Sequence, residues 1–356
     1  MSANAALPPE AFAAALAALP GMWPLKLTEV LASYTPQEAW CRVDDAAVDV
    51  AAGWAAYQAH GIAVHLHGRP GYPPSLAGDH QAPAVLFSKG DPSALVGPRV
   101  AIVGSRRCTR YGRDLSFDLG RDLAEAGVRV VSGLALGIDG AAHLGALAAG
   151  GGAAPPVAVV GSGLDVIYPR AHARLWAEVA ETGVVLSEAP LGARPEAWRF
   201  PARNRILAAL ADVVVVVESR ANGGSRYTVA AADERGVKVM AVPGPVRSPA
   251  SAYANELLVS GSAPARDALD VLVALHLEGR RPRGDAAKAA PRPDDPDQAA
   301  LLEALGWEPA SLEQLVARTG LSPGQASVAL ARLEMGGWVV GGAGWWEQVS
   351  TGSPAK

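Results

Sequence analysis

Residues 99–112 read RVAIVGSRRCTRYG, and residues 128–143 read VRVVSGLALGIDGAAH. Each stretch starts with a short valine-rich run and reaches a turn of glycine and serine. Between the two runs, Leu115, Leu119 and Leu123 fall on one face of a helix expected over residues 111–126. The region therefore predicts a right-handed strand–helix–strand unit. Its two turns leave the carboxyl ends of parallel strands, where open α/β sheets bind their ligands.

The first of these turns differs from a dinucleotide-binding turn. That fingerprint needs a second glycine two positions after the first, and an acid at the end of the second strand. Here Arg106 takes the glycine position and Ser132 with Gly133 ends the strand, so a NAD-type site is not expected. An arginine beside the amides of a helix start suits a phosphate carried on a larger ligand. The alternative interpretation is that Arg106 and Arg107 are solvated loop residues.

Four further stretches repeat the pattern of a strand followed by a glycine- or serine-containing loop, at residues 156–160, 184–186, 213–217 and 237–242. The unbroken β-branched run 213–217 is typical of a central parallel strand covered on both faces. Six strands alternating with helices predict a doubly wound parallel sheet, with all the loops on one rim.

That rim is where we expect a ligand. It gathers glycine and serine turns together with Arg106, Arg170, Arg203, Arg205 and Arg226. Because one nucleotide needs about one such loop, several loops indicate a longer polyanion lying in a groove. The acids of the rim either cap helix starts and orient arginines, which we favour, or act as catalytic carboxylates; they are Asp139, Asp165, Glu188 and Glu218. For His143, one helical turn after Asp139, packing or capping is favoured over general-base chemistry.

Composition limits the remaining possibilities. The chain of 356 residues has room for two or three domains, and its net charge of −4 gives no global basic field. Cys41 and Cys108 form no disulfide or metal pattern, and no acid or cysteine completes a metal site with His65 and His67. No leader or long apolar span is evident, so we expect a cytoplasmic protein without membrane contact, metal or cofactor.

The flanking regions predict smaller modules. Residues 1 to about 60 read as short helices of an N-terminal domain expected over residues 1–70, and residues 61–95 read as short strands with glycine and proline. LPGMWP at 19–24 resembles a degraded helix-hairpin-helix turn in a SAM-like or helix-hairpin-helix-like domain, for which a packing role is favoured. The composition of residues 279–297 predicts a flexible linker. Residues 298–350 read as three capped helices and a hairpin, similar to a winged helix. Acidic residues outnumber basic residues in this module. We therefore expect it to contact another protein or to have a packing role at least as readily as to contact DNA.

Within residues 72–272, a series of blocks follows the order seen in the DprA (Smf, DNA-processing protein A) family: VAIVGSRRCTRYG, VVSGLALGIDGAAHLGAL, VVGSGLDVIYPR, LSEAPLG, FPARNRILAALAD and VMAVPG. The resemblance implies an extended Rossmann-like domain that binds single-stranded DNA, forms a homodimer and passes the strand to RecA recombinase in natural transformation and recombination. Residues 252–257 depart from the family in a region used for self-association.

The resemblance also places DNA contacts. The arginine of the GSR turn and the basic residue ending the YPR block correspond to Arg106 and Arg170. Together with the other turns and the FPxRNR block, the expected contacts with single-stranded DNA are Gly104, Ser105, Arg106, Arg107, Ser132, Gly133, Gly161, Gly163, Arg170, Phe200, Arg203, Asn204, Arg205 and Arg226.

Phosphoribohydrolases that cleave nucleoside monophosphates share this fold and are the alternative. Their loop reads PGGxGTxxE and supplies a glutamate for cleavage. Here residues 223–228 read GGSRYT, and Val229, Ala230 and Ala231 follow without a carboxylate. The sequence therefore predicts binding rather than an enzyme. A third hypothesis, a scaffold for RecA without DNA binding, stays open.

Overall fold

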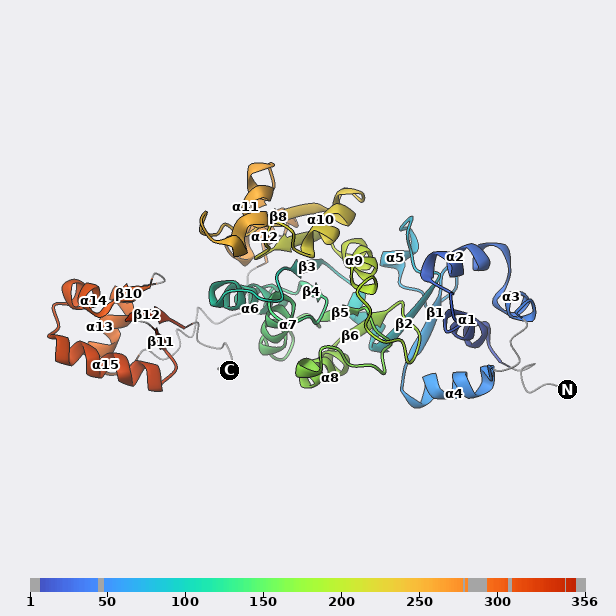
Figure 1. Ribbon diagram of the computed structural model, residues 1–356, viewed down its shortest axis with the longest axis horizontal. Helices are drawn as coiled ribbons and strands as arrows, with labels where there is room; N and C mark the ends of the chain where they lie inside the picture. The colour runs from blue at the N-terminus through green and yellow to red at the C-terminus, as the bar shows by residue number, and fades with distance from the viewer. Residues whose placement is uncertain are drawn as a thin grey trace. The chain divides into compact units, whose positions relative to one another are not determined.

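The structure is a computed structural model that describes residues 7–43, 48–277, 279–280, 293–306, 309–342 and 344–349. The chain divides into two compact units, residues 1–283 and 284–356 (Figure 1). Most of the expected linker, residues 281–292, lies outside the described residues.

A nine-stranded sheet organises the first unit, in the order β1-β2-β6-β5-β4-β3-β7-β8-β9. From β6 to β9 all neighbouring strands run parallel. These strands are β3 (Arg99–Val103), β4 (Arg129–Ser132), β5 (Val157–Val160), β6 (Val184–Ser187), β7 (Val213–Val216), β8 (Lys238–Ala241) and the short β9 (Ala263–Pro264). The six parallel strands expected from the sequence are confirmed.

Two antiparallel strands extend the sheet beyond that prediction. β2 (Val85–Gly90) pairs with β6, and β1 (Ala63–Leu66) pairs with β2. The sequence indicates short strands here but does not join them to the sheet, because edge pairing depends on contacts between distant segments.

The order of the strands creates a switch point. The chain moves from β3 through β4 and β5 to β6 in one direction, and α9 (Arg199–Leu210) then leads to β7 on the other side of β3. Connections on the two sides of β3 thus diverge, and a crevice opens at the carboxyl ends of β3 and β7.

Helices cover both faces of the sheet. Val100 and Ile102 face a cluster with Leu119, Leu123 and Val271. On this face lie α6 (Arg110–Glu125), α7 (Ile138–Ala148), α8 (Ala173–Thr182) and α12 (Ala268–Ala274). On the other face lie α9, α5 (Pro74–Ala77), α10 (Ser225–Asp233) and α11 (Ala252–Val259). In the described part of the chain, 3-10 turns occupy Pro92–Leu95, Arg170–His172 and Pro249–Ser251. Because helices cover both faces of the sheet, both faces of each central strand are apolar, and the strand sequences do not alternate between apolar and polar residues.

Two glycines allow α6 and α7 to pack closely. A Cβ atom on Gly120 would lie 2.2 Å from the Ala142 carbonyl oxygen, and one on Gly145 would lie 1.9 Å from the Phe117 carbonyl oxygen. Both glycines are therefore required by the close approach of the backbones.

The N-terminal helices pack on the sheet rather than standing apart. They are α1 (Pro9–Ala17), α2 (Pro24–Ser33), α3 (Pro36–Cys41) and α4 (Val50–Ala59). Leu16 shares a core with Val64 and Phe87, and the Tyr57 ring stacks on Phe87 at 5.2 Å. These helices belong to the same compact unit as the sheet. The boundary at residue 70 stays a prediction.

The second unit has the winged-helix arrangement expected from the sequence. It contains α13 (Pro296–Leu305), β10 (Ala310–Ser311), α14 (Leu312–Thr319), α15 (Pro323–Met335), β11 (Val339–Gly342) and β12 (Trp345–Gln348), with strand order β10-β12-β11. Capping boxes at Ser311 and Ser322 begin α14 and α15. Both arginines of the described part have partners: Arg318 donates to the Ala304 carbonyl at 3.0 Å and Arg332 to Asp295 at 3.3 Å.

Candidate nucleic-acid interface

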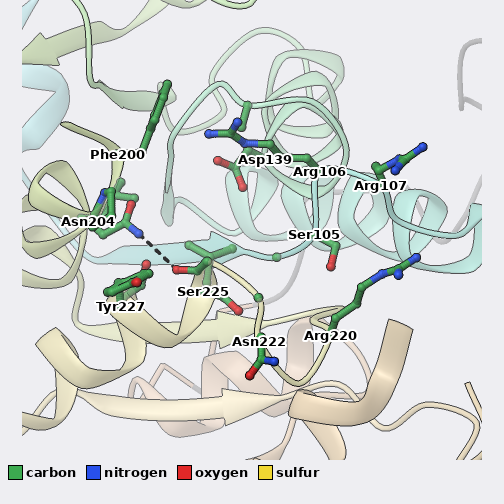
Figure 2. Close-up of a pocket in the computed structure, with 18 of the residues that line it drawn as sticks. Ser105, Arg106, Arg107, Asp139, Phe200, Asn204, Arg220, Asn222, Ser225 and Tyr227 are labelled. Carbon is green, nitrogen blue, oxygen red and sulfur yellow. Dashed lines mark hydrogen bonds between the residues drawn. The ribbon is translucent and has the colours of Figure 1, made fainter. Parts of the chain in front are cut away.

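A pocket of about 820 Å³ lies at the switch point. The β3 turn, α9 and the segment from Arg220 to Thr228 form most of its wall. Figure 2 shows Phe200, Asn204 and Tyr227 on one side of the pocket and Arg107 and Arg220 on the other. The pocket is thus aromatic and amide-lined at one end and cationic at the other.

Glu218 holds the β3 turn in place. The Ser105 amide donates to the Glu218 carbonyl at 2.7 Å, and the Glu218 carboxylate accepts from the Thr109 amide at 2.8 Å and the Thr109 hydroxyl at 2.6 Å. A Cβ atom on Gly104 would lie 2.6 Å from that carbonyl oxygen. This acid therefore has a capping role, as the sequence analysis favoured.

Arg106 and Arg107 project from this turn and are exposed. The Arg106 guanidinium lies 4.5 Å from the centre of the Phe200 ring, and the Phe200 ring lies 5.6 Å from that of Tyr168. Arg170 is exposed just beyond Tyr168. In the described part of the chain, neither a hydrogen bond nor an ion pair engages the guanidinium groups of Arg106, Arg107 or Arg170. Their donors remain available to a ligand.

The other predicted arginines are turned toward the protein. Arg203 is 7% exposed, donates to the Val159 carbonyl, and lies so close to Gly133 that a Cβ atom there would be 1.8 Å from its Nη1. Burial lowers the pKa of Arg203 to about 10 and raises the pKa of Asp139. The positive charge of the nearby Arg203 opposes the rise in the pKa of Asp139.

Arg205 and Arg226 are also engaged. Arg205 donates to Glu188 at 2.5 Å. Burial raises the pKa of Glu188, and Arg205 acts in the opposite direction. Arg226 donates to the Ala221 carbonyl at 2.6 Å and lies 4.5 Å from the centre of the Tyr253 ring. The expectation that all five arginines stand open on the rim is therefore not met. Burial and nearby acceptors hold Arg203 and Arg205, and a carbonyl and a ring hold Arg226.

The remaining predicted residues form the floor of the rim. The Ser132 hydroxyl donates to the Ile102 carbonyl at 2.6 Å, the Gly133 amide donates to Asp139 at 3.2 Å, and the Gly163 amide donates to the Ala193 carbonyl at 2.9 Å. Gly161 is buried and lines a hollow beside Phe200. Asn204 donates to the Gly224 carbonyl at 3.4 Å (Figure 2).

Several residues that line the pocket are not predicted from the sequence, among them Arg220, Asn222 and Tyr227. Arg220 is exposed, with its guanidinium unpaired among the described residues, and the Tyr227 side chain is 57% exposed. Arg220 could have been predicted, because it follows the valine-rich strand β7 and therefore lies at the rim, like the arginines that were predicted. Consecutive residues of a helix point about 100° apart, so Arg226 and Tyr227 face different ways and only Tyr227 lines the pocket.

His143 is fully buried, and burial lowers its pKa to about 3. It is therefore neutral at pH 7 and packed, which agrees with the favoured interpretation. The described residues contain no group of three or more His, Cys, Asp or Glu side chains that could hold a metal ion. None of the helices in the described ranges combines the length and apolar character that a membrane span requires.

The fold and the pocket define a Rossmann-like protein with free arginines and aromatic rings at its switch point. Comparison with known families agrees. The model described as DNA recombination-mediator protein A matches residues 63–276, and the DprA winged helix domain matches residues 285–344. The chain belongs to this family, DprA/Smf.

Individual relatives support the same assignment. The chain is 37% identical over 274 residues to Protein Smf of Escherichia coli K12, a match that covers 75% of this chain and 72% of that protein. It is 39% identical over 280 residues to the putative DNA processing protein DprA of Mycobacterium tuberculosis H37Rv, covering 76% and 70%.

Two solved structures are also similar. The X-ray structure of DNA processing protein A from Streptococcus pneumoniae has a TM-score of 0.59 and 35% identity, covering 67% of this chain and 81% of that one. A structure that describes the single-stranded DNA binding mode of DNA processing protein A from Helicobacter pylori has a TM-score of 0.54 and 29% identity, covering 62% and 97%.

Proposed function

We propose that this chain binds single-stranded DNA along the carboxyl ends of its parallel strands and passes the strand to RecA recombinase in transformation and recombination. One observation carries the DNA-binding part of the proposal. Among the described residues, Arg106, Arg107, Arg170 and Arg220 are exposed without a hydrogen bond or ion pair on their guanidinium groups, beside aromatic rings on one rim. The single-stranded DNA binding described for the Helicobacter pylori relative supports it.

The chemistry of the rim suits an unpaired strand. A guanidinium group donates two parallel hydrogen bonds to a phosphate, and an aromatic ring stacks on any base. Phe200 lies next to Arg106, and Tyr168 lies next to Phe200, so a phosphate partner and base partners are neighbours on the rim. Because neither kind of contact reads base edges, we expect little sequence preference and strong salt dependence.

The engaged arginines have a different role in this proposal. Arg203 and Arg205 fix α9 and the β5 and β6 ends through Val159 and Glu188, and thereby position Phe200 and Asn204. Gly104 and Gly133 contribute by internal packing, because a Cβ atom at either position would meet the Glu218 carbonyl or the Arg203 guanidinium.

We further propose that the protein is a cytoplasmic homodimer and binds DNA without cleaving nucleotides. In support of self-association, the apolar residues Val246 and Val259 flank the segment 252–257 that the family uses for it, and they are 91% and 90% exposed. Asp139 is the carboxylate that lines the switch-point pocket within the described residues, and it already accepts from the Gly133 amide.

The test is a titration of labelled oligo-dT with the full chain at two ionic strengths, together with incubation with AMP and detection of released adenine. We expect tight binding at low salt, weaker binding at high salt and no adenine. Release of adenine at a steady rate would favour the phosphoribohydrolase alternative. Recombinase binding without any DNA binding would favour the scaffold hypothesis.

A further inference from the structure

The switch-point pocket continues along the rim as a series of adjoining hollows. It shares Arg106 and Phe200 with a hollow at the ends of β4 and β5. That hollow shares Gly161 with the next one, toward β6. The last of the series, a pocket of about 450 Å³, shares Trp198 and Arg199 with its neighbour. The two hollows in between are small, about 50 Å³ and about 20 Å³. We call this line of adjoining hollows, from β7 past β6 to the N-terminal helices, the groove.

The last pocket, which we call the N-terminal pocket, lies between two segments far apart in the sequence. One wall is the turn between α1 and α2, residues 19–24, which the sequence analysis singled out as a degraded helix-hairpin-helix turn. The other wall is the segment after β6, residues 188–199. Each wall contributes an exposed indole: Trp23 is 54% exposed and Trp198 is 47% exposed. Large aromatic side chains that remain half exposed in a pocket are available to a flat ligand.

A cationic side chain lies near each of the two indole rings. The Arg199 guanidinium lies 4.5 Å from the centre of the Trp198 ring, and the Trp198 Nε1 donates to Glu196 at 2.9 Å. The Lys26 Nζ lies 5.6 Å from the centre of the Trp23 ring. These contacts orient the Trp198 ring before any ligand arrives, which reduces the entropy lost on binding.

The charges of the N-terminal pocket favour a base of the DNA strand over a phosphate. Its two carboxylates are both paired, Glu196 with Arg199 at 3.1 Å and Glu188 with Arg205 at 2.5 Å. Arg199, the arginine among the described lining residues, is thus paired, unlike Arg106 and Arg170. A phosphate gains little here, whereas an uncharged aromatic base can stack on an indole.

We propose that Trp23 and Trp198 bind an unpaired nucleobase of the same DNA strand that the rim arginines hold by its phosphates. The DNA path then extends from the switch point onto the N-terminal helices, and the turn at residues 19–24 is part of the binding surface. This inference rests on the proposed single-strand binding. It adds a second, stacking-dominated site at the far end of the groove.

The experiment compares the full chain with its Trp23→Ala/Trp198→Ala variant on a series of oligo-dT strands from about 6 to about 30 nucleotides, a range that brackets typical single-strand sites. Trp345→Ala is the matched control, because its indole is 47% exposed and lies in the second unit. We expect the double variant to lose about fivefold or more in affinity for the long strands. Its affinity for the shortest strand and its salt slope should stay unchanged, because a lost stack removes no phosphate contact.

Equal affinity of the variant and the wild type at every length would overturn the inference. Failure of the wild type to bind any strand would instead overturn the proposed function. A second measurement does not depend on the folding of the variant: wild-type protein is photo-crosslinked to oligo-dT containing 4-thiothymidine. Crosslinks to the peptides of Trp23 or Trp198 support the inference. Crosslinks confined to the region of Arg106 and Phe200 contradict it.

Discussion

Replacement of Arg106 and Arg170 by alanine tests the central proposal. Neither guanidinium group has a hydrogen-bond or ion-pair partner among the described residues, so their loss leaves no unpaired carboxylate and the fold should persist. For single strands, each phosphate contact contributes about 0.7 to the slope of log K against log salt. Loss of two contacts should therefore lower the slope by about 1.4 and weaken binding about 25-fold at about 0.1 M salt.

The assay is fluorescence anisotropy of labelled oligo-dT at several salt concentrations. The charge-matched control is Arg318→Ala/Arg332→Ala in the second unit, where both side chains already have partners within the protein. We expect the control to retain the wild-type slope. Equal losses from the two pairs, or a weakened affinity with an unchanged slope, would refute the assignment of the rim as the phosphate-binding surface.

Three further predictions concern the scaffold. Arg203→Ala should lower the free energy of unfolding by about 3 kcal/mol in a urea titration, because the Val159 carbonyl loses its buried donor and Asp139 loses the neighbouring charge; a change within error would contradict a structural role. His143 has a folded pKa of about 3 against an ordinary value of 6.5, so the unfolded chain binds a proton more readily in this range and stability falls as pH drops below 6.5. His143→Leu should remove about 2 kcal/mol of that fall by about pH 5, and identical pH profiles of variant and wild type would argue against it. Gly145→Ala should cost about 1–3 kcal/mol in thermal or urea unfolding, because the new methyl group meets the Phe117 carbonyl. Gly53→Ala, in open space on α4, should be neutral or stabilising, and similar losses from the two glycine variants would exclude the packing explanation.

Local sequence patterns predicted the parallel core and not its edges. Valine-rich runs such as residues 213–217 end in turns and have only one stable environment, a strand covered on both faces. The pairing of β1 with β2 and of β2 with β6 depends instead on which distant segment is free to complete the sheet edge. The same limit explains why the packing of α1 on that edge could not be foreseen from the helical pattern of the first residues.

The direction of an arginine side chain was equally hard to predict. Arg203 and Arg205 lie two positions apart on α9, so they leave the helix on different sides and meet different acceptors, Val159 and Glu188. From the motif one can predict that both residues are basic and lie near the rim. One cannot predict from it which buried carbonyl or carboxylate each side chain contacts. By contrast Arg106 extends from a loop, and its guanidinium group makes no hydrogen bond or ion pair with the described residues, so sequence and structure agree that it is exposed.

The acids of the rim show why the proposed binding of a polyanion is compatible with a net charge of −4. Each acid near the groove accepts hydrogen bonds from the protein itself: Glu218 from Thr109, Glu188 from Arg205, Asp139 from the Gly133 amide and Asp165 from the Gly192 amide at 2.9 Å. A carboxylate that is held in this way repels phosphate less than a free one, because its charge is partly neutralised and its lone pairs are occupied. The arginines without such partners then dominate the local field, and a local field is sufficient because exposed charges beyond about 10 Å are screened at about 0.1 M salt. This division between paired acids and unpaired arginines is the reason that net charge does not predict the ligand.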